Sequence, residues 1–229
     1  MIEPRIIVAL DFPSAKEALT FVKQMDPKLC RLKIGLELFC KEGPAIVEKI
    51  RSWGYSIFLD LKLHDIPNTV AAAIHSLITL EPWMVSIHAL GGSAMMKAAL
   101  EASRQAASPP IITAVTMLTS LDSNDAYSMF AMDVRNMAVR LARLAQESGC
   151  GALVTSAHEI PWFKEVLPVK PIFVVPGIRP ESSNDDQRRT ATPYEALAKG
   201  ADFLVVGRPV TRAKDPLTAL QRLEASMHL

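Results

Sequence analysis

Short, almost purely apolar runs recur along the chain, and longer segments with apolar residues at helical spacing separate them. The apolar runs lie at 5–11, 30–35, 56–62, 84–89, 111–117, 151–155, 171–176 and 203–207. They are nearly continuous rather than alternating, which is typical of strands that are buried on both faces of a parallel sheet. The pattern therefore predicts eight parallel strands.

Helices are predicted between these strands. Ser14 can cap the first, with Glu17 at the capping-box position, and Ala45–Ile50 belongs to the second. Pro67 can begin the third, because proline is tolerated in the first helical turn. Later helices are predicted over 93–106, 133–148, 158–166, 193–199 and 216–227. The stretches 118–130 and 178–192 are predicted to be irregular, and long loops of this kind often bind ligands.

Strands that alternate with helices in this way predict an α/β fold, a (β/α)8 TIM barrel. The 229 residues are 49% hydrophobic, which is enough for one sizeable core, so a single domain over 1–229 is expected. An open, doubly wound sheet is the alternative topology. It is less favoured because no Gly-x-Gly-x-x-Gly motif follows the first strand.

The charge balance and the cysteines limit the possible partners and the compartment. Charged residues make up 21% of the chain and the formal net charge is +1, which argues against nucleic acid or an anionic membrane as a partner. No apolar run approaches the ~20 residues of a membrane span, and the N-terminus does not resemble a leader peptide. Cys30, Cys40 and Cys150 are scattered and odd in number, which indicates reduced thiols in a cytoplasmic protein.

Polar residues gather where the predicted strands end. These residues are Asp11, Lys33, Asp60, Lys62, His88, Thr116, Thr119, Gly177, Arg179, Gly207 and Arg208. In a barrel the carboxyl ends of all strands meet on one face, where the active site is built. The shared position of so many polar side chains predicts a catalytic site at this mouth.

The segment Asp60–Thr69 is the strongest candidate for chemistry. Asp60 and Lys62 lie two residues apart on a strand, so they share a face, and Asp65 lies just beyond the strand end. Burying ions is costly unless they are paired, so a cluster of this kind points to function. The plain structural alternative is an Asp60–Lys62 ion pair that only stabilises the fold.

Three other charged or polar strand ends also have structural explanations. Asp11 could cap a helix, Lys33 could extend its ammonium to solvent, and His88 could be a hydrogen-bonded core residue. Taken together, however, these explanations require several coincidental placements on one rim.

Two strand ends carry a glycine followed closely by an arginine, in 176–179 (PGIR) and 206–209 (VGRP). Barrels often bind phosphate after their last two strands, where glycine lets backbone N–H groups approach the anion and arginine adds charge-assisted contacts. Ordinary turn glycines beside surface arginines are the alternative. No metal site is predicted, because the five histidines have no paired-ligand spacing.

These motifs resemble the orotidine 5'-phosphate decarboxylase family over nearly the whole chain. The matching segments are Val8–Asp11, Lys33–Gly35, Asp60–Thr69, Thr119–Ser120, Pro176–Arg179, Asp186–Arg189 and Gly207–Pro209. The resemblance implies decarboxylation of orotidine 5'-phosphate to UMP, the last step of de novo UMP synthesis, without a metal or a cofactor.

The resemblance also implies a role for individual residues. Lys62 would protonate C6 of the pyrimidine, Asp60 would lie near the leaving carboxylate, and Lys33 would support the charged network. Asp65 and Thr69 would reach into the site of a neighbouring subunit, so a homodimer is expected. The residues implied to contact substrate are Asp11, Lys33, Asp60, Leu61, Lys62, Leu63, His64, Asp65, Ile66, Pro67, Asn68, Thr69, Thr119, Ser120, Arg179, Gln187, Gly207 and Arg208.

Two other functions remain open at this point. A sugar-phosphate decarboxylase or lyase on a related barrel would share the Asp-x-Lys-x-x-Asp core but would use Mg2+. A nucleotide-binding protein without catalysis would bind UMP and not turn substrate over, since a fold alone does not determine function.

Overall fold

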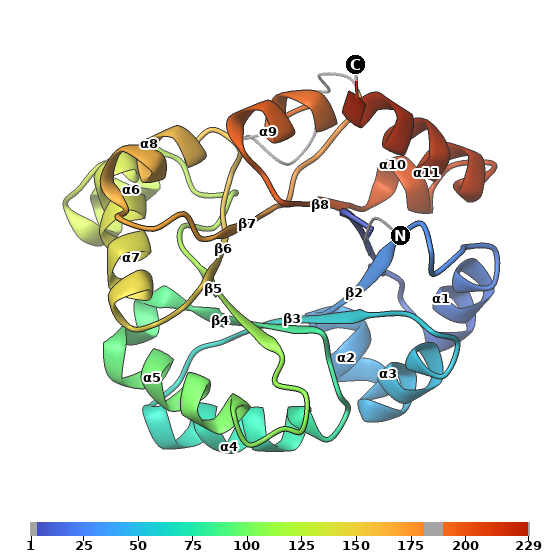
Figure 1. Cartoon of the computed structure of the whole chain (residues 1–229), viewed down its shortest axis with the longest axis horizontal. Coiled ribbons are helices and arrows are strands. Elements are labelled where there is room, and N and C mark those ends of the chain that lie inside the picture. Colours follow the sequence, from blue (N-terminus) through green and yellow to red (C-terminus); the bar gives the residue numbers. More distant parts are fainter. Residues whose placement is uncertain (1–3, 181–189, 229) are drawn as a thin grey trace.

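In a computed structural model, which describes residues 4–180 and 190–228, eight parallel strands close into a barrel in the order β1 to β8 (Figure 1). Helices surround the barrel on its outside. The predicted (β/α)8 architecture is confirmed, and the doubly wound alternative is wrong because β1 pairs with β8 as well as with β2. The described part of the chain holds no helix with both the length and the apolar composition to cross a membrane.

Each predicted apolar run coincides with a strand to within a few residues at either end. The strands are β1 (Ile6–Ala9), β2 (Arg31–Gly35), β3 (Ile57–Leu63), β4 (Met84–His88), β5 (Ile111–Val115), β6 (Ala152–Val154), β7 (Ile172–Val175) and β8 (Phe203–Val206). β1, β2, β4 and β6 are buried along their whole length, and the other four are buried at most positions, as expected for a parallel sheet covered by helices.

The helices begin and end within a few residues of most predictions. They are α1 (Ala15–Val22), α2 (Leu36–Glu42), α3 (Pro44–Arg51), α4 (Pro67–Ile78), α5 (Gly92–Ser103), α6 (Ser123–Phe130), α7 (Val134–Glu147), α8 (Ile160–Val166), α9 (Pro193–Lys199), α10 (Arg208–Thr211) and α11 (Pro216–Ala225), with 3-10 turns η1 (Ala89–Gly91) and η2 (Ser226–His228). The Ser14 side chain accepts from the Glu17 N–H, and Pro67 opens α4, as predicted.

The prediction of an irregular 118–130 stretch is wrong in its second half, where α6 forms. Asp122 accepts from the backbone of Asn124 and Asp125 in a capping box, which satisfies orphan N–H groups at the start of the helix. Only Ala126 of this helix is buried, so the helix carries almost no apolar periodicity that a sequence pattern could reveal. The short helices α2 and α10 were also not predicted.

The core has an inner and an outer layer. The inner cluster fills the barrel with side chains that point inward from every second strand position, including Ile7, Phe58, Met84, Val115 and Val174. The outer and larger cluster lies between the strands and the surrounding helices. A barrel packed in this way has no pore, so a ligand can enter only at its ends.

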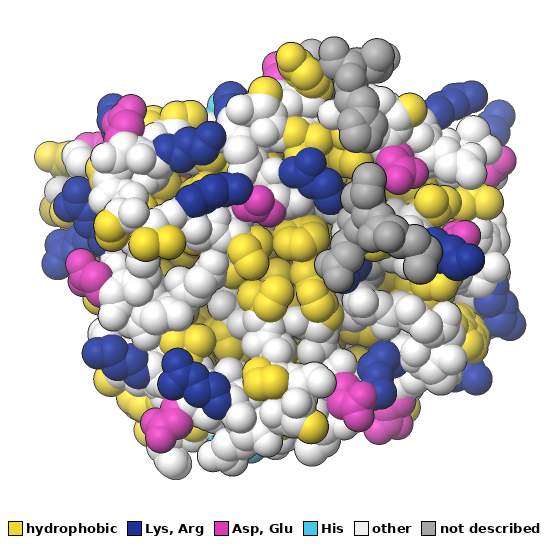
Figure 2. Space-filling view, viewed as in Figure 1, with side chains coloured by type: hydrophobic (Ala, Val, Ile, Leu, Met, Phe, Trp, Pro, Cys, Tyr) yellow, Lys and Arg dark blue, Asp and Glu magenta, His cyan; other side chains and the backbone are white. Residues whose placement is uncertain are grey.

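The end at which the strands begin is sealed by aromatic residues. Trp83 and Phe203 meet edge to face with their ring centroids 4.9 Å apart, and the Arg31 guanidinium lies 4.0 Å from the Trp83 ring centroid. Hydrophobic side chains gather at the centre of this end (Figure 2). We call Arg31, Trp83 and Phe203 the barrel floor.

Candidate active site

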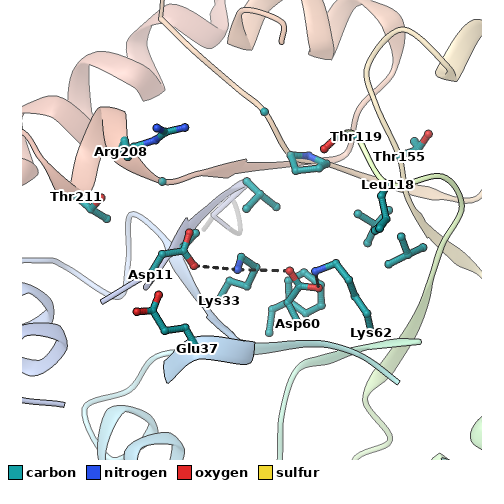
Figure 3. Close-up of a pocket in the computed structure, with 18 of the residues that line it drawn as sticks. Asp11, Lys33, Glu37, Asp60, Lys62, Leu118, Thr119, Thr155, Arg208 and Thr211 are labelled. Carbon is teal, nitrogen blue, oxygen red and sulfur yellow. Dashed lines mark hydrogen bonds and ion pairs between the residues drawn. The ribbon is translucent and has the colours of Figure 1, made fainter. Parts of the chain in front are cut away.

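The opposite end of the barrel holds a cavity of about 520 Å³. Its walls come from the carboxyl ends of strands β1, β2, β3, β5, β6, β7 and β8 and from the segments that follow them. Asp11, Lys33, Asp60 and Lys62 form a row along one side, and Arg208 and Thr211 lie above the Asp11 end of this row (Figure 3). The structure therefore brings together polar residues that are far apart in the sequence, in the arrangement that the strand ends predicted.

The four charged residues form a continuous network. Lys33 Nζ lies 3.5 Å from Asp11 Oδ1 and 3.4 Å from Asp60 Oδ2. Lys62 Nζ donates to Asp60 Oδ1 at 2.9 Å. Each oxygen of Asp60 thus has its own ammonium, and the Asp60 side chain is only 13% exposed. The network places two positive charges within reach of one cavity.

Asp60 is held in its ionised form by this arrangement. Burial by itself raises the pKa of the carboxyl, but Lys33 and Lys62, with hydrogen bonds from Lys62 and Ser86, outweigh that effect and bring the pKa below its ordinary value. The consequence is a permanent negative charge at the base of the cavity in the neutral pH range.

Lys62 has an unusual backbone. Its φ is +50°, in the left-handed region that side chains other than glycine rarely adopt. The pairing of β3 with β4 shifts register between Leu59 and Leu63, so Lys62 lies within a bulge of the strand. Strain of this kind persists only where surrounding contacts support it, and it gathers at functional sites.

Gly35 gives Lys33 the room to reach both carboxylates. A Cβ at position 35 would lie 3.1 Å from Lys33 Nζ, which is closer than ordinary contact. A larger residue there would push the ammonium away from its partners. The Lys33–Gly35 motif is therefore a packing requirement of the network.

The arginine side of the cavity comes from the ends of β7 and β8. Gly177, Arg179, Gly207 and Arg208 all line the cavity. Gly177 has φ +78°, which favours glycine, and the buried Arg179 donates to the Ile178 carbonyl at 2.9 Å. Gln187, with the rest of the predicted Asp186–Arg189 motif, lies outside the described residues.

Residues 64–69 lie away from the cavity. All six of them are exposed, Ile66 by 66% of its surface, and none lines the cavity of its own chain. Asp65 accepts from the Ile66 N–H at 2.7 Å, at the entry to α4. The structure thus does not bring Asp65 or Thr69 to the Lys62 network within one chain.

Some of the remaining predicted contact residues line the cavity, and others lie in the core or at the surface. Leu61 and Leu63 belong to the outer core against the helices. Thr119 lines the cavity, whereas Ser120 is exposed and lies outside the lining. His88 is 7% exposed, and its ring stacks on that of His64 with the centroids 5.6 Å apart. Burial, followed by the charges of His64 and Lys62, lowers the pKa of His88 to about 4.

The sequence analysis missed five polar residues of the site, including Thr211 and Arg212, which line the cavity from the segment after β8. Glu37 lines the cavity from α2, and Thr155 lines it from the end of β6. Ser86, in the middle of β4, hydrogen-bonds to Asp60. Ser86 could have been found from the sequence, because it is a serine within an apolar strand. It lies two residues before His88 and therefore on the same face.

Metal ions in proteins are held by clustered carboxylate, imidazole or thiolate side chains. In the described parts of the chain, no group of three or more His, Cys, Asp and Glu side chains lies in a metal-binding arrangement. Both oxygens of Asp60, the most buried carboxylate of the network, face a lysine ammonium.

Comparison with known proteins identifies the family. The family model described as "Orotidine 5'-phosphate decarboxylase / HUMPS family" matches residues 4–223. The chain belongs to this family. Relatives named orotidine 5'-phosphate decarboxylase include one from Dichelobacter nodosus, 51% identical over 97% of this chain and 98% of its own length, and one from Nitrosococcus oceani, 47% identical over 99% of both.

Two solved structures are similar to this chain over the whole barrel. An orotidine 5'-phosphate decarboxylase from Lactobacillus acidophilus matches with a TM-score of 0.87 and 32% identity, covering 100% of both chains. An uncharacterized conserved protein from Geobacillus kaustophilus matches with a TM-score of 0.86 and 37% identity, covering 97% of this chain and 99% of its own. The similarity thus extends over nearly the full length of both solved structures.

Proposed function

We propose that this protein decarboxylates orotidine 5'-phosphate to UMP and CO2, the last step of de novo UMP synthesis. Membership of the family and the names of its relatives support this substrate. The observation that carries the proposal is the Lys62 ammonium, which Asp60 holds at 2.9 Å beside an open cavity. A proton donor is thereby held in position before the substrate arrives.

The chemistry requires such an acid. The bond between C6 and the carboxylate breaks, CO2 leaves, and the electron pair of the bond stays on C6 as a carbanion that the ring cannot delocalise. The Lys62 ammonium stabilises this charge and then gives its proton to C6, which completes UMP. Lys62 regains a proton from solvent. Proton donor and charge stabiliser are therefore the same group.

Asp60 and Lys33 set the conditions for that step. The substrate carboxylate enters beside the ionised Asp60, so two negative charges oppose each other until CO2 leaves. Lys33 neutralises part of the charge and connects Asp60 to Asp11, which lies where a ribose hydroxyl could bind. The same crowding that raises the energy of the bound substrate is relieved in the transition state.

The 5'-phosphate binds on the opposite side of the mouth. Arg179 and Arg208, with the backbone of Gly207, form a positive and glycine-lined wall suited to a phosphate. Gln187 and the 178–192 loop complete this contact in the proposal. Binding energy from the phosphate, which does not react, orients the ring over Lys62. Thr119 and Ser120 are proposed near the pyrimidine.

The active form is proposed to be a homodimer. His64–Thr69 are exposed, and Asp65 lies outside the cavity of its own chain, so these residues are available to the site of a second copy. Asp65 and Thr69 of one subunit complete the neighbouring cavity in this proposal. A mixture of Lys62→Ala and Asp65→Ala proteins tests it, because subunit exchange restores one site per heterodimer. Failure to recover activity in a verified heterodimer contradicts the proposal.

The magnesium-dependent sugar-phosphate reaction is the less favoured function. Mg2+ needs carboxylate oxygens, and the two lysines occupy both oxygens of Asp60. A metal ion would have to displace an ammonium from the most buried carboxylate of the site. The intact network likewise argues against a protein that binds nucleotides without catalysis.

We further propose that residues 1–229 form one catalytic domain and that the protein works in the cytoplasm. Cys30, Cys40 and Cys150 are all free thiols, which suits a reducing compartment. Burial raises the pKa of Cys30 and Cys150 to about 12, so these two thiols stay protonated and unreactive.

The deciding experiment is the ultraviolet change on mixing the protein with orotidine 5'-phosphate in EDTA. Rapid conversion to UMP is expected. Absence of turnover in EDTA, with recovery on adding Mg2+ and a sugar phosphate, would instead identify the alternative reaction. Tight binding of UMP with no turnover under either condition would indicate a binding protein.

A further inference from the structure

Ser86 lies inside the barrel directly beneath the charged network. It is fully buried in β4, where Met84, Ser86 and His88 point to the same side of the strand. It is not among the residues that line the cavity, so it does not meet the substrate directly. Any effect of Ser86 on the reaction therefore passes through the residues that it contacts.

The Ser86 hydroxyl makes two hydrogen bonds of opposite sense. It donates its single proton to Asp60 Oδ1 at 2.9 Å, and its oxygen accepts from the Lys62 backbone N–H at 2.8 Å. Asp60 Oδ1 is also the oxygen that accepts from Lys62 Nζ. Ser86 thus holds the backbone of the acid and the carboxylate that positions its ammonium.

The bulge in β3 explains why a side chain is needed at this point. Leu59 pairs with Val85 and Leu63 with Ile87, so four steps along β3 match only two along β4. Lys62 lies in the surplus segment with its backbone in the left-handed region. Its N–H is paired with the Ser86 hydroxyl rather than with a carbonyl of the neighbouring strand.

We propose that Ser86 is the positioning residue for the Asp60–Lys62 pair, and that its hydroxyl holds the strained Lys62 backbone and the Asp60 carboxylate in one geometry. The inference rests on the proposed decarboxylation for its effect on rate. It assigns to β4 a share in a site that is otherwise built from strand ends. Without the hydroxyl, the Lys62 ammonium is no longer held in position beside the reacting carbon.

Thr113 provides a matched control within the same barrel layer. It is the register partner of Ser86 across β4 and β5, and it is also fully buried. Its hydroxyl has no hydrogen-bond partner among the described residues. Thr113→Val therefore removes a buried hydroxyl next to Ser86 without removing a contact to the network.

The test compares Ser86→Ala, Ser86→Thr and Thr113→Val with the wild type in single-turnover and steady-state assays on orotidine 5'-phosphate. Ser86→Ala is expected to lower the chemical rate roughly ten- to a hundredfold, the effect of losing a hydrogen bond to a charged group. KM should change little, because the phosphate wall is untouched. Ser86→Thr should recover most of the rate, and Thr113→Val should match the wild type.

The acid limb of the pH–rate profile separates positioning from a general loss of structure. Ser86 donates to the ionised form of Asp60, whose other charged neighbours are Lys33 and Lys62, so loss of the hydroxyl should move the acid limb to higher pH. Thr113→Val should leave the limb in place. A folded Ser86→Ala protein with the wild-type rate and the wild-type limb would overturn the proposal.

Two additions keep the result decisive. If Ser86→Ala does not fold, Ser86→Cys takes its place, because a thiol has a similar shape to a hydroxyl but is a weak hydrogen-bond donor. A wild-type rate in the cysteine variant would then overturn the proposal. A carbon-13 NMR titration of the Asp60 carboxyl needs no turnover. A wild type that fails to decarboxylate would contradict the proposed function, while an unchanged Asp60 titration in Ser86→Ala would contradict the role of Ser86.

Discussion

Strand β2 carries two buried cations on the same face, and the two ends of the barrel use them differently. Arg31 points to the floor, where its guanidinium lies 4.0 Å from the Trp83 centroid and 5.4 Å from that of Phe203. Lys33, two residues later, points to the mouth and lies between Asp11 and Asp60. Both residues are less than a tenth exposed.

The difference shows that burial of a charge does not by itself mark a catalytic group. At the floor the cation meets the faces of aromatic rings, which both stabilise it and close the barrel. At the mouth the cations meet carboxylates beside an open cavity, with a strained backbone at Lys62. A cavity together with crowded charges indicates function. Removal of a cation at the mouth should therefore lower turnover, and removal of the cation at the floor should lower stability.

The largest expected effect is that of Lys62→Ala on turnover. The variant loses both the proton donor and the charge beside C6, so kcat should fall at least about ten-thousandfold. Circular dichroism and thermal melting should report a folded barrel, because Lys62 is partly exposed and its hydrophobic neighbours stay in place. A folded mutant with a rate near that of the wild type would remove Lys62 from the mechanism.

The next effect concerns the arginine wall of the mouth. Arg208→Ala should lower kcat/KM for orotidine 5'-phosphate by roughly a hundredfold, because charge-assisted contacts to phosphate are lost. Orotidine without its phosphate should lose far less. Equal relative losses on the two substrates would mean that Arg208 does not act on the phosphate.

The third effect is a pH-dependent loss of stability at His88, the last residue of β4. His88 has a folded pKa of about 4 against an ordinary value of 6.5. Between these values the unfolded chain binds a proton that the folded protein does not, so the free energy of unfolding should fall by on the order of 3 kcal/mol as the pH drops from 6.5 to 4.

Urea unfolding of the wild type and of His88→Asn over this pH range measures the effect. Asparagine does not titrate and keeps an acceptor for the Leu90 N–H, which bonds to His88 Nδ1 at 3.3 Å in the wild type. The difference between the two proteins should shrink as the pH falls. Parallel curves would show that His88 does not lose its proton affinity on folding.

The smallest effect is expected at the floor. Arg31→Met keeps an apolar stem under Trp83 but removes the charge over the ring, so the free energy of unfolding should fall by about 1–2 kcal/mol. Turnover should stay within about twofold of the wild type, because the floor is at the far end of the barrel from the cavity. A loss of kcat comparable to that of Lys62→Ala would erase the distinction between the two ends.

Much of this molecule can be predicted from its pattern of residues. The eight strands stand out because both of their faces are buried, and Asp11, Lys33, Asp60 and Lys62 stand out as charges at the ends of apolar runs. Helix α6 was missed because it buries only Ala126, although the capping box of Asp122 and Asp125 was an available signal for its start. Glu37 was missed for a related reason, because the helix that carries it was not predicted.

The sequence is enough to predict the fold class, the family and most of the charged groups at the mouth. These properties depend on local composition and order along the chain, which the hydrophobic effect and strand periodicity translate directly into structure. Only the folded barrel shows the left-handed backbone of Lys62, its bond to Ser86 and the contrast between Arg31 and Lys33. Each of these depends on the register between neighbouring strands and on the closure of the barrel, and such contacts join residues that no local pattern connects.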